Sequence, residues 1–139
     1  MMPNPVGYSG TQLAKKLGFK PVSSIEVINA PDHYATLFTD LSDDIEIGLT
    51  PKEGRDFIHF FTSKKEEYFN GLAGIKARIK PGGAIWISWP KKSSKVPTDL
   101  TENIIRDFAI QTGLVDIKVC AIDEIWSGLK LVIPVKDRK

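Results

Sequence analysis

The 139 residues of this chain suffice for one domain with a single core, and 42% hydrophobic against 26% charged residues is an ordinary globular mixture. Nineteen basic against 17 acidic residues leave a formal net charge of +2, which argues against a nucleic acid or a membrane surface as the partner. The single cysteine, Cys120, excludes an internal disulfide. Residues 1–10 lack a signal-peptide pattern, and no apolar run reaches the roughly 20 residues of a membrane helix. We therefore expect a cytoplasmic protein.

The spacing of apolar residues predicts helices and strands in the first half of the chain. The predicted elements are a helix over 11–17, a strand over 23–30, a helix over 31–41, and strands over 44–50 and 56–62. Gly18 suits the end of the first helix, and Pro31 suits the first turn of the second. We expect one domain over 1–139, in which residues 1–22 form an N-terminal appendage to an α/β core over 23–139.

Two helices, a strand and a hairpin are predicted in the second half. The predicted elements are a helix over 63–80, a strand over 84–89, a helix over 99–112, and an antiparallel hairpin of strands over 114–123 and 129–135. Ser63 with Glu66, and Asp99 with Glu102, have the spacing of a capping box, which satisfies free amides at a helix start. The "KPGG" stretch over 80–83 predicts the end of the first of these two helices.

The order of these elements predicts an α/β protein with three layers. A mostly parallel sheet of about six strands should carry helices on both faces and the antiparallel hairpin at one edge. From "FIHFFTS" (57–63) onward, the strand, helix, "KPGG" turn, strand, helix and hairpin resemble the C-terminal half of class I methyltransferases that use S-adenosylmethionine. The resemblance implies a Rossmann-like sheet with the strand order second, first, third, fourth, sixth, fifth.

A second resemblance spans most of the chain. "GYSGTQLAKKLG" (7–18), "WISWPKKSSKVPTDLTE" (86–102) and "DEIWSGLKLVI" (123–133) are similar to signature stretches of a small bacterial family, DUF3052. That resemblance implies no particular reaction, substrate or catalytic residue for this chain.

The loop after the first predicted strand differs from that of the methyltransferases. Their cofactor requires a close backbone approach by a glycine-rich loop, and the resemblance also implies an acid at the end of the second strand. The stretch 29–34 contains no glycine, Pro31 lacks an amide hydrogen, and "IGLT" (47–50) has no acid, since Glu46 lies earlier in the strand. We therefore predict a non-catalytic protein without a cofactor; the alternative is a divergent methyltransferase in which Asp32 contacts the ribose.

Lysine-rich loops follow several predicted strands. Ligands of open parallel sheets bind beyond the carboxyl ends of the strands, next to the point where strand order reverses. Helix N-termini should face the same rim, and their unpaired amides favour an anion such as a phosphate, a nucleotide or an acidic peptide. The predicted anion site consists of Asn29, Ser63, Lys64, Lys65, Lys91, Lys92 and Lys95. The competing interpretation is that these lysines only keep a surface solvated.

Aromatic residues and histidines provide secondary candidates for the same ligand. Trp89, at a strand end, offers a ring for stacking, whereas Trp86 should face the other side of the sheet and belong to the core. His33, near a helix start, is a candidate acid or base. His59 shares a face with apolar residues and is expected to be buried with its nitrogens satisfied.

Two further segments have alternative interpretations. "GYSGT" (7–11) offers either an amide nest for a phosphate, with Tyr8, Ser9 and Thr11, or a cap on the sheet. The "DEIWSG" loop (123–128) and an exposed edge strand would suit a scaffold that joins a protein partner, and the oligomeric state is open. Two histidines and one cysteine without close spacing predict no zinc site.

Overall fold

The structure, a computed structural model, describes residues 13–20, 23–32, 34, 45–48, 50 and 52–138. The elements are α1 (Leu13–Leu17), β1 (Ser24–Ile28), β2 (Glu46–Gly48), β3 (Arg55–Phe61), α2 (Lys65–Arg78), β4 (Ile79–Pro90), η2 (Lys92–Ser94), α3 (Glu102–Gln111), β5 (Val115–Ala121), β6 (Trp126–Val132) and η3 (Val135–Asp137). The helix predicted over 31–41 lies mostly outside the described residues. No helix in the described part of the chain is long and apolar enough to cross a membrane.

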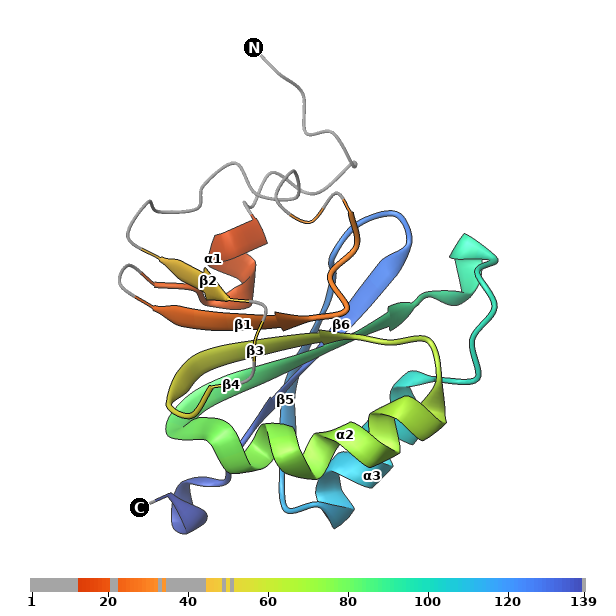
Figure 1. Cartoon of the computed structure of the whole chain (residues 1–139). Helices are drawn as coiled ribbons and strands as arrows, with labels where there is room; N and C mark the ends of the chain where they lie inside the picture. Colours follow the sequence, from red (N-terminus) through yellow and green to blue (C-terminus); the bar gives the residue numbers. More distant parts are fainter. Residues whose placement is uncertain are drawn as a thin grey trace.

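The strands form one mixed sheet in the order β2-β1-β3-β4-β6-β5 (Figure 1). β1 pairs in parallel with β2 and β3, and β3 pairs in parallel with β4. β6 runs antiparallel to both of its neighbours, β4 and β5. The Rossmann-like fold class, the strand order and the C-terminal hairpin are therefore confirmed.

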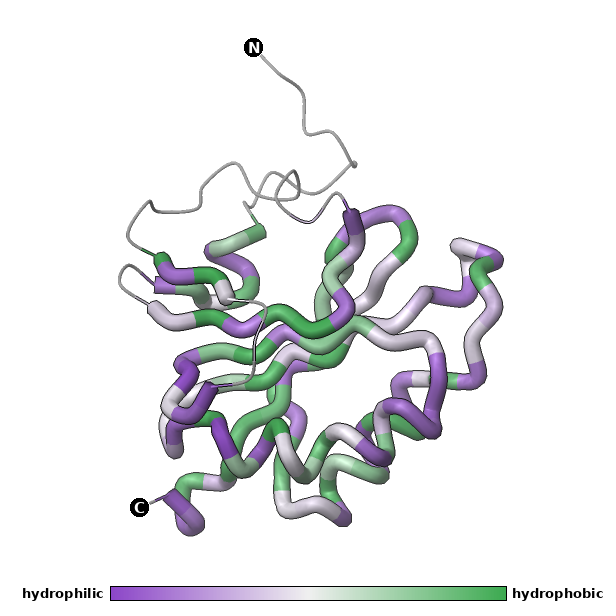
Figure 2. Tube along the Cα trace, viewed as in Figure 1, coloured by the Kyte–Doolittle hydropathy of each residue, from purple (hydrophilic) through white to green (hydrophobic). Residues whose placement is uncertain are grey.

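Two apolar clusters cover opposite faces of this sheet. On one face, α2 and α3 lie side by side and bury Tyr68, Leu72 and Ile105 (Figure 1). Hydrophobic residues run along the central strands, and hydrophilic ones gather at loop tips (Figure 2). Trp86 belongs to one cluster and Trp89 to the other, as the alternation of a strand predicts.

The short helix α1 belongs to the second cluster. Leu13, Ala14 and Leu17 are buried against the sheet, and Gly18, with a φ of 84°, ends the helix as predicted. The indole nitrogen of Trp86 donates a hydrogen bond to the carbonyl oxygen of Leu17 at 2.9 Å. This bond anchors α1 to the middle of the sheet, because Trp86 is fully buried in β4.

The "KPGG" stretch is part of a strand. The helix α2 ends at Arg78, just before this stretch, but β4 already begins at Ile79. Ile79 pairs with Arg55 of β3, and the register between the two strands then shifts. A Cβ added at Gly83 would lie 2.7 Å from the carbonyl oxygen of Asp56. Glycine is thus required here by the close approach of two backbones.

Both predicted capping boxes are wrong. The N-cap of α2 is Lys64, and the amide of Lys65 donates to a carboxylate oxygen of Asp99 at 2.7 Å. The N-cap of α3 is Thr101, whose hydroxyl accepts from the amide of Ile104 at 3.2 Å. The cap of α2 comes from a residue 34 positions away in the sequence, so a local pattern does not reveal it.

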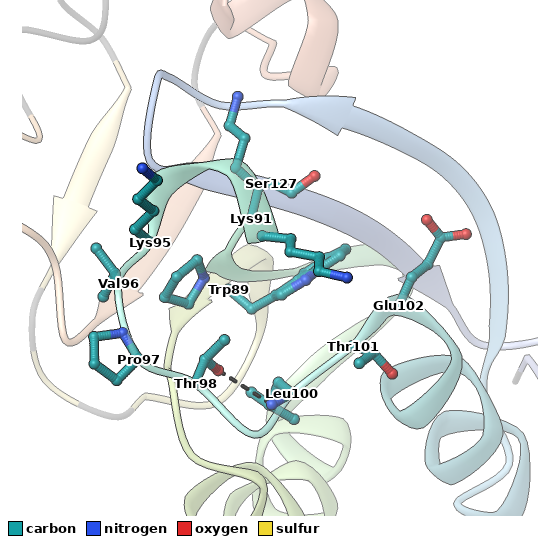
Figure 3. Close-up of a pocket in the computed structure, with 12 residues that line it drawn as sticks. Trp89, Lys91, Lys95, Val96, Pro97, Thr98, Leu100, Thr101, Glu102 and Ser127 are labelled. Atoms are coloured by element: carbon teal, nitrogen blue, oxygen red, sulfur yellow. Dashed lines mark hydrogen bonds between the residues drawn. The ribbon is translucent and has the colours of Figure 1, made fainter.

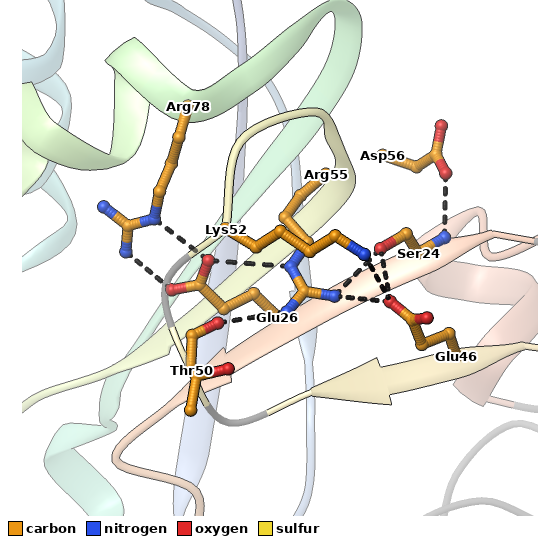
Figure 4. A network of polar contacts seen from close by, with 8 residues as sticks. All are labelled: Ser24, Glu26, Glu46, Thr50, Lys52, Arg55, Asp56 and Arg78. Atoms are coloured by element: carbon orange, nitrogen blue, oxygen red, sulfur yellow. Dashed lines mark hydrogen bonds and ion pairs between the residues drawn. The ribbon is translucent and has the colours of Figure 1, made fainter.

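A buried ion-pair network holds the amino ends of the strands together (Figure 4). Glu26, of which 1% is exposed, accepts two hydrogen bonds from Arg78, at 2.9 and 2.6 Å. Arg55 is also buried, and its Nη1 donates to the side chains of Ser24 and Glu46, both at 2.9 Å. The network thereby connects β1, β2, β3 and the end of α2.

Arg55 also shapes the strand next to it. Its Nη2 donates to the carbonyl oxygen of Thr50 at 3.0 Å, while its Nε lies 3.8 Å from Glu26 and has no hydrogen-bond partner among the described residues. A Cβ added at Gly48 would lie 2.5 Å from Nη2. The guanidinium therefore occupies the space in which a side chain at position 48 would stand.

Replacing Arg78 by methionine is expected to lower the free energy of unfolding by about 3 kcal/mol, because it leaves the buried Glu26 without its closest cation. Urea unfolding at neutral pH measures this loss. Arg106→Met is the matched control, since Arg106 forms its ion pairs with Glu102 and Asp116 at the surface and should cost much less. An equal loss of unfolding free energy in the two variants would contradict a stabilising role of the buried network.

Candidate functional site

A cavity of about 640 Å³ lies beyond the carboxyl end of β4 (Figure 3). Its volume is in the range of about 300–1,000 Å³ that small-molecule sites usually have. The lining comes from the β4–α3 connection, the first turn of α3 and the start of β6, and consists of Trp89, Pro90, Lys91, Lys92, Lys95, Val96, Pro97, Thr98, Leu100, Thr101, Glu102 and Ser127.

Local hydrogen bonds fix the loop that forms one wall of this cavity. The hydroxyl of Ser94 donates to the carbonyl of Lys91 at 2.7 Å and accepts from the amide of Val96 at 3.2 Å. The hydroxyl of Thr98 donates to the carbonyl of Ser63 at 2.6 Å, which ties the loop to the end of β3. The lysine-rich stretch is therefore a folded structure.

One further hydrogen bond and one unusual backbone angle fix the path of the loop that carries the lysines. The amide of Lys91 donates to the carbonyl of Ile125 at 2.8 Å, so the loop also rests on the β5–β6 hairpin. Lys95 has a φ of 62°, in the left-handed region that side chains other than glycine rarely adopt. Pro90 and Pro97 stiffen the two ends of the loop, as expected from the sequence.

The floor of the cavity is apolar and its mouth is basic. Trp89 and Leu100 are 6% and 3% exposed and belong to the core, while Val96 is 39% exposed at the rim. Lys92 and Lys95 are exposed and Lys91 is half-buried. Within the described ranges, none of these three amines forms an ion pair with a carboxylate.

The N-terminus of α3 forms the opposite wall. Thr101 caps this helix of ten residues, so the free amides of its first turn lie beside the cavity. Glu102 projects from the same wall (Figure 3) and pairs with Arg106, which also bonds Asp116 at 2.9 Å. The acids around Arg106 raise the pKa of its guanidinium, with the hydrogen bond to Asp116 as the largest cause, followed by that to Glu102.

The structure gathers part of the predicted anion site. Lys91, Lys92 and Lys95 all line the cavity, together with Trp89. Ser63 contributes a carbonyl that accepts from Thr98 at the edge of the cavity. Because Trp89 is almost fully buried, it offers part of its surface to a ligand and not an exposed face.

Other predicted site residues lie elsewhere. Lys64 is the N-cap of α2, and its amide donates to the hydroxyl of Thr62 at 3.2 Å. Lys65 begins α2 and Asn29 follows β1, so neither lines the cavity. The secondary candidates Tyr8, Ser9, Thr11 and His33 lie outside the described residues.

Side chains connect the strand ends at the point where the strand order reverses. Asn29, with a φ of 58°, donates from its side-chain amide to the carbonyl of Phe61 at 3.1 Å. The ring of Phe61 packs edge-on against Trp126, with 5.0 Å between centroids. β1 and β3 are thus linked at their carboxyl ends, and the cavity lies one strand further along, beyond β4.

His59 is a buried and satisfied histidine, as predicted. Its Nε2 lies 2.7 Å from the hydroxyl of Ser88, and its Nδ1 lies 3.1 Å from the hydroxyl of Tyr34. Complete burial lowers the pKa of His59 to about 3, and burial also raises the pKa of Tyr34. The imidazole is therefore neutral at physiological pH.

The sequence missed residues that the fold brings to the cavity. Thr101 and Glu102 directly follow the lysine loop, at the start of α3. Because a helix start was expected there, these two residues could have been added to the predicted site. Ser127 comes from β6 and reaches the cavity only because β6 pairs with β4 opposite Trp89. No local pattern in the sequence marks it.

Several solved structures with a similar fold are methyltransferases. A SAM-dependent methyltransferase from Aquifex aeolicus has a TM-score of 0.65 and 13% identity, covering 86% of this chain and 87% of that chain. The mitomycin 7-O-methyltransferase MmcR has a TM-score of 0.60 and 11% identity, covering 81% and 49%. A ribosomal protein L11 methylase from Lactobacillus delbrueckii subsp. bulgaricus has a TM-score of 0.57 and 11% identity, covering 86% and 74%.

These comparisons show a Rossmann-like, methyltransferase-like fold and nothing finer, because the identities are low. No family model and no curated protein matches the chain. The resemblance to DUF3052 therefore stays a prediction.

Replacing Lys95 by glycine is expected to leave the free energy of unfolding unchanged or to raise it by up to about 1 kcal/mol, because glycine adopts a positive φ without strain. Lys92→Gly is the control: its φ is not positive, and the added chain freedom should cost about 0.5–1 kcal/mol. Urea unfolding measures both variants. A clear loss for Lys95→Gly would show that the loop adopts another conformation.

Proposed function

We propose that this chain is a cytoplasmic, non-catalytic protein that binds a small anionic ligand in the cavity beyond β4. The observation that supports this is the convergence of three lysines without described carboxylate partners on one concave, partly apolar site. We also propose that the chain is similar to the DUF3052 family. That resemblance implies no reaction, which agrees with a non-catalytic protein.

The electrostatics of the site favour an anion in two ways. Three ammonium groups contribute full positive charges at the mouth, and the free amides of α3 contribute about half a charge beside it. The low-dielectric floor formed by Trp89 and Leu100 strengthens these interactions relative to a flat, solvated surface. The fixed loop also lowers the entropy lost on binding.

Titration with inorganic phosphate at low ionic strength, followed by NMR, tests the proposal. The double variant Lys91→Gln, Lys92→Gln is expected to weaken phosphate binding about tenfold or more, since about 1.4 kcal/mol corresponds to a factor of ten. The control Lys136→Gln changes an exposed lysine in η3, outside the cavity, and should bind phosphate as the parent does. Equal affinity in all three proteins would refute an anion site at this loop.

A divergent methyltransferase is the second candidate, supported by the fold of the solved neighbours. Three features argue against it: the loop after β1 has no glycine, the Asn29 amide links the ends of β1 and β3, and Glu46 is paired with Arg55 at the amino end of β2. In this candidate, Asp32 would contact the ribose of S-adenosylmethionine.

Calorimetric titration with S-adenosylmethionine is expected to give no saturable heat, because no described loop combines the glycines and the acid that the cofactor requires. Inorganic phosphate in the same cell is the positive control for a folded, binding-competent protein. Low-micromolar binding that is lost in an Asp32→Asn variant would favour the methyltransferase and overturn the non-catalytic proposal.

A further inference from the structure

The cavity is much larger than a bare anion. Its volume of about 640 Å³ lies well inside the range of roughly 300–1,000 Å³ that is usual for small-molecule sites. A phosphate or sulfate held by the lysines would leave most of this space to water. The size of the site therefore indicates an organic ligand.

The polar groups of the cavity are unevenly distributed. Lys91 and Lys95 both come from the loop between β4 and α3, whereas Glu102 projects from the first turn of α3 on the other side of the cavity (Figure 3). Glu102, Arg106 and Asp116 together carry a net charge of −1, which opposes the half charge of the α3 amides, so this wall favours an anionic group less than the lysine loop does. A ligand should thus carry its negative charge at one end only.

The surface between these two walls is apolar. Trp89 and Leu100 form the floor, and Val96 and Pro97 form the side of the loop (Figure 3). The hydroxyl of Thr98 donates to the carbonyl of Ser63 and accepts from the amide of Leu100, while the hydroxyl of Thr101 accepts from the amide of Ile104. The middle of the cavity therefore offers few free polar partners and favours hydrocarbon or ring atoms.

We propose that the ligand is an organic monoester phosphate or carboxylate with a ring: the anionic group contacts Lys91 and Lys95, and the ring lies on Trp89, Val96 and Pro97. This inference rests on the proposed function and adds the class of ligand to it. The ring supplies the affinity through buried apolar surface, and the lysines fix its orientation.

Four probes separate the parts of this proposal: inorganic phosphate, phenyl phosphate, benzoate and benzyl alcohol, each titrated by NMR. Phenyl phosphate is expected to bind at least tenfold more tightly than inorganic phosphate, and benzyl alcohol at least tenfold more weakly than phenyl phosphate. Comparison of phenyl phosphate with benzoate decides between a phosphate and a carboxylate. Shifts of the amide resonances of Val96 and Ser127 should accompany binding, since both residues line the cavity.

Variants measure how much the apolar part and the lysines of the cavity each contribute to ligand affinity. Val96→Ser should weaken phenyl phosphate about threefold or more and leave inorganic phosphate unchanged, because Val96 contributes only apolar surface. Val135→Ser is the matched control, since Val135 is 76% exposed in η3 and should affect neither probe. Lys91→Gln should weaken both phosphate and phenyl phosphate. Each variant is also checked for its unfolding midpoint.

The outcomes distinguish this inference from the function on which it rests. If phenyl phosphate and inorganic phosphate bind equally, with both sensitive to Lys91→Gln, the ring is refuted while the anion site stands. If benzyl alcohol binds as tightly as phenyl phosphate, the site is apolar and both proposals fail. Absence of binding by all four probes, or shifts confined to residues outside the cavity, would also refute both.

Discussion

The pairing of β4 along both of its edges is the constraint on which the rest of this structure depends. β4 joins the parallel half of the sheet, through β3, to the antiparallel hairpin, through β6. Its alternating tryptophans belong to the two apolar clusters on opposite faces. Because β6 continues this pairing up to Pro90, the hairpin lies beside the strand end, and the lysine loop that follows rests on it. One strand thereby determines both the core and the position of the cavity.

The methyltransferase-like fold of this chain has a connection after β1 that contains no glycine. Asn29 turns the chain in the left-handed conformation that a glycine usually supplies, but its side chain then bonds β3. In the proposed function, the concave site lies instead beyond β4, where prolines and serine hydroxyls hold a loop rich in lysine.

The sequence predicted those features that depend on local pattern. Alternation and periodicity indicated the strands, and the resemblance implied their order, which the pairing confirms. The lysines of the cavity could be predicted because they lie in one loop at a strand end. The cap of α2 and Ser127 could not, since Asp99 caps a helix that begins 34 residues earlier and Ser127 depends on the register of β4 with β6. The predicted site residues Lys64 and Asn29 have other partners: the backbone amide of Lys64 donates to the hydroxyl of Thr62, and the side-chain amide of Asn29 donates to the carbonyl of Phe61.

The buried imidazole of β3 makes the stability of the fold depend on acidity. Burial holds the pKa of His59 at about 3 in the folded chain, whereas an unfolded chain binds the proton at its ordinary pKa of about 6.5. Between these two values the unfolded state carries the additional proton, so the free energy of unfolding rises with pH across this window by up to about 1.4 kcal/mol per pH unit. Above the upper value this contribution is complete. The core of the sheet is thus best suited to a neutral environment, and mild acidification favours its opening.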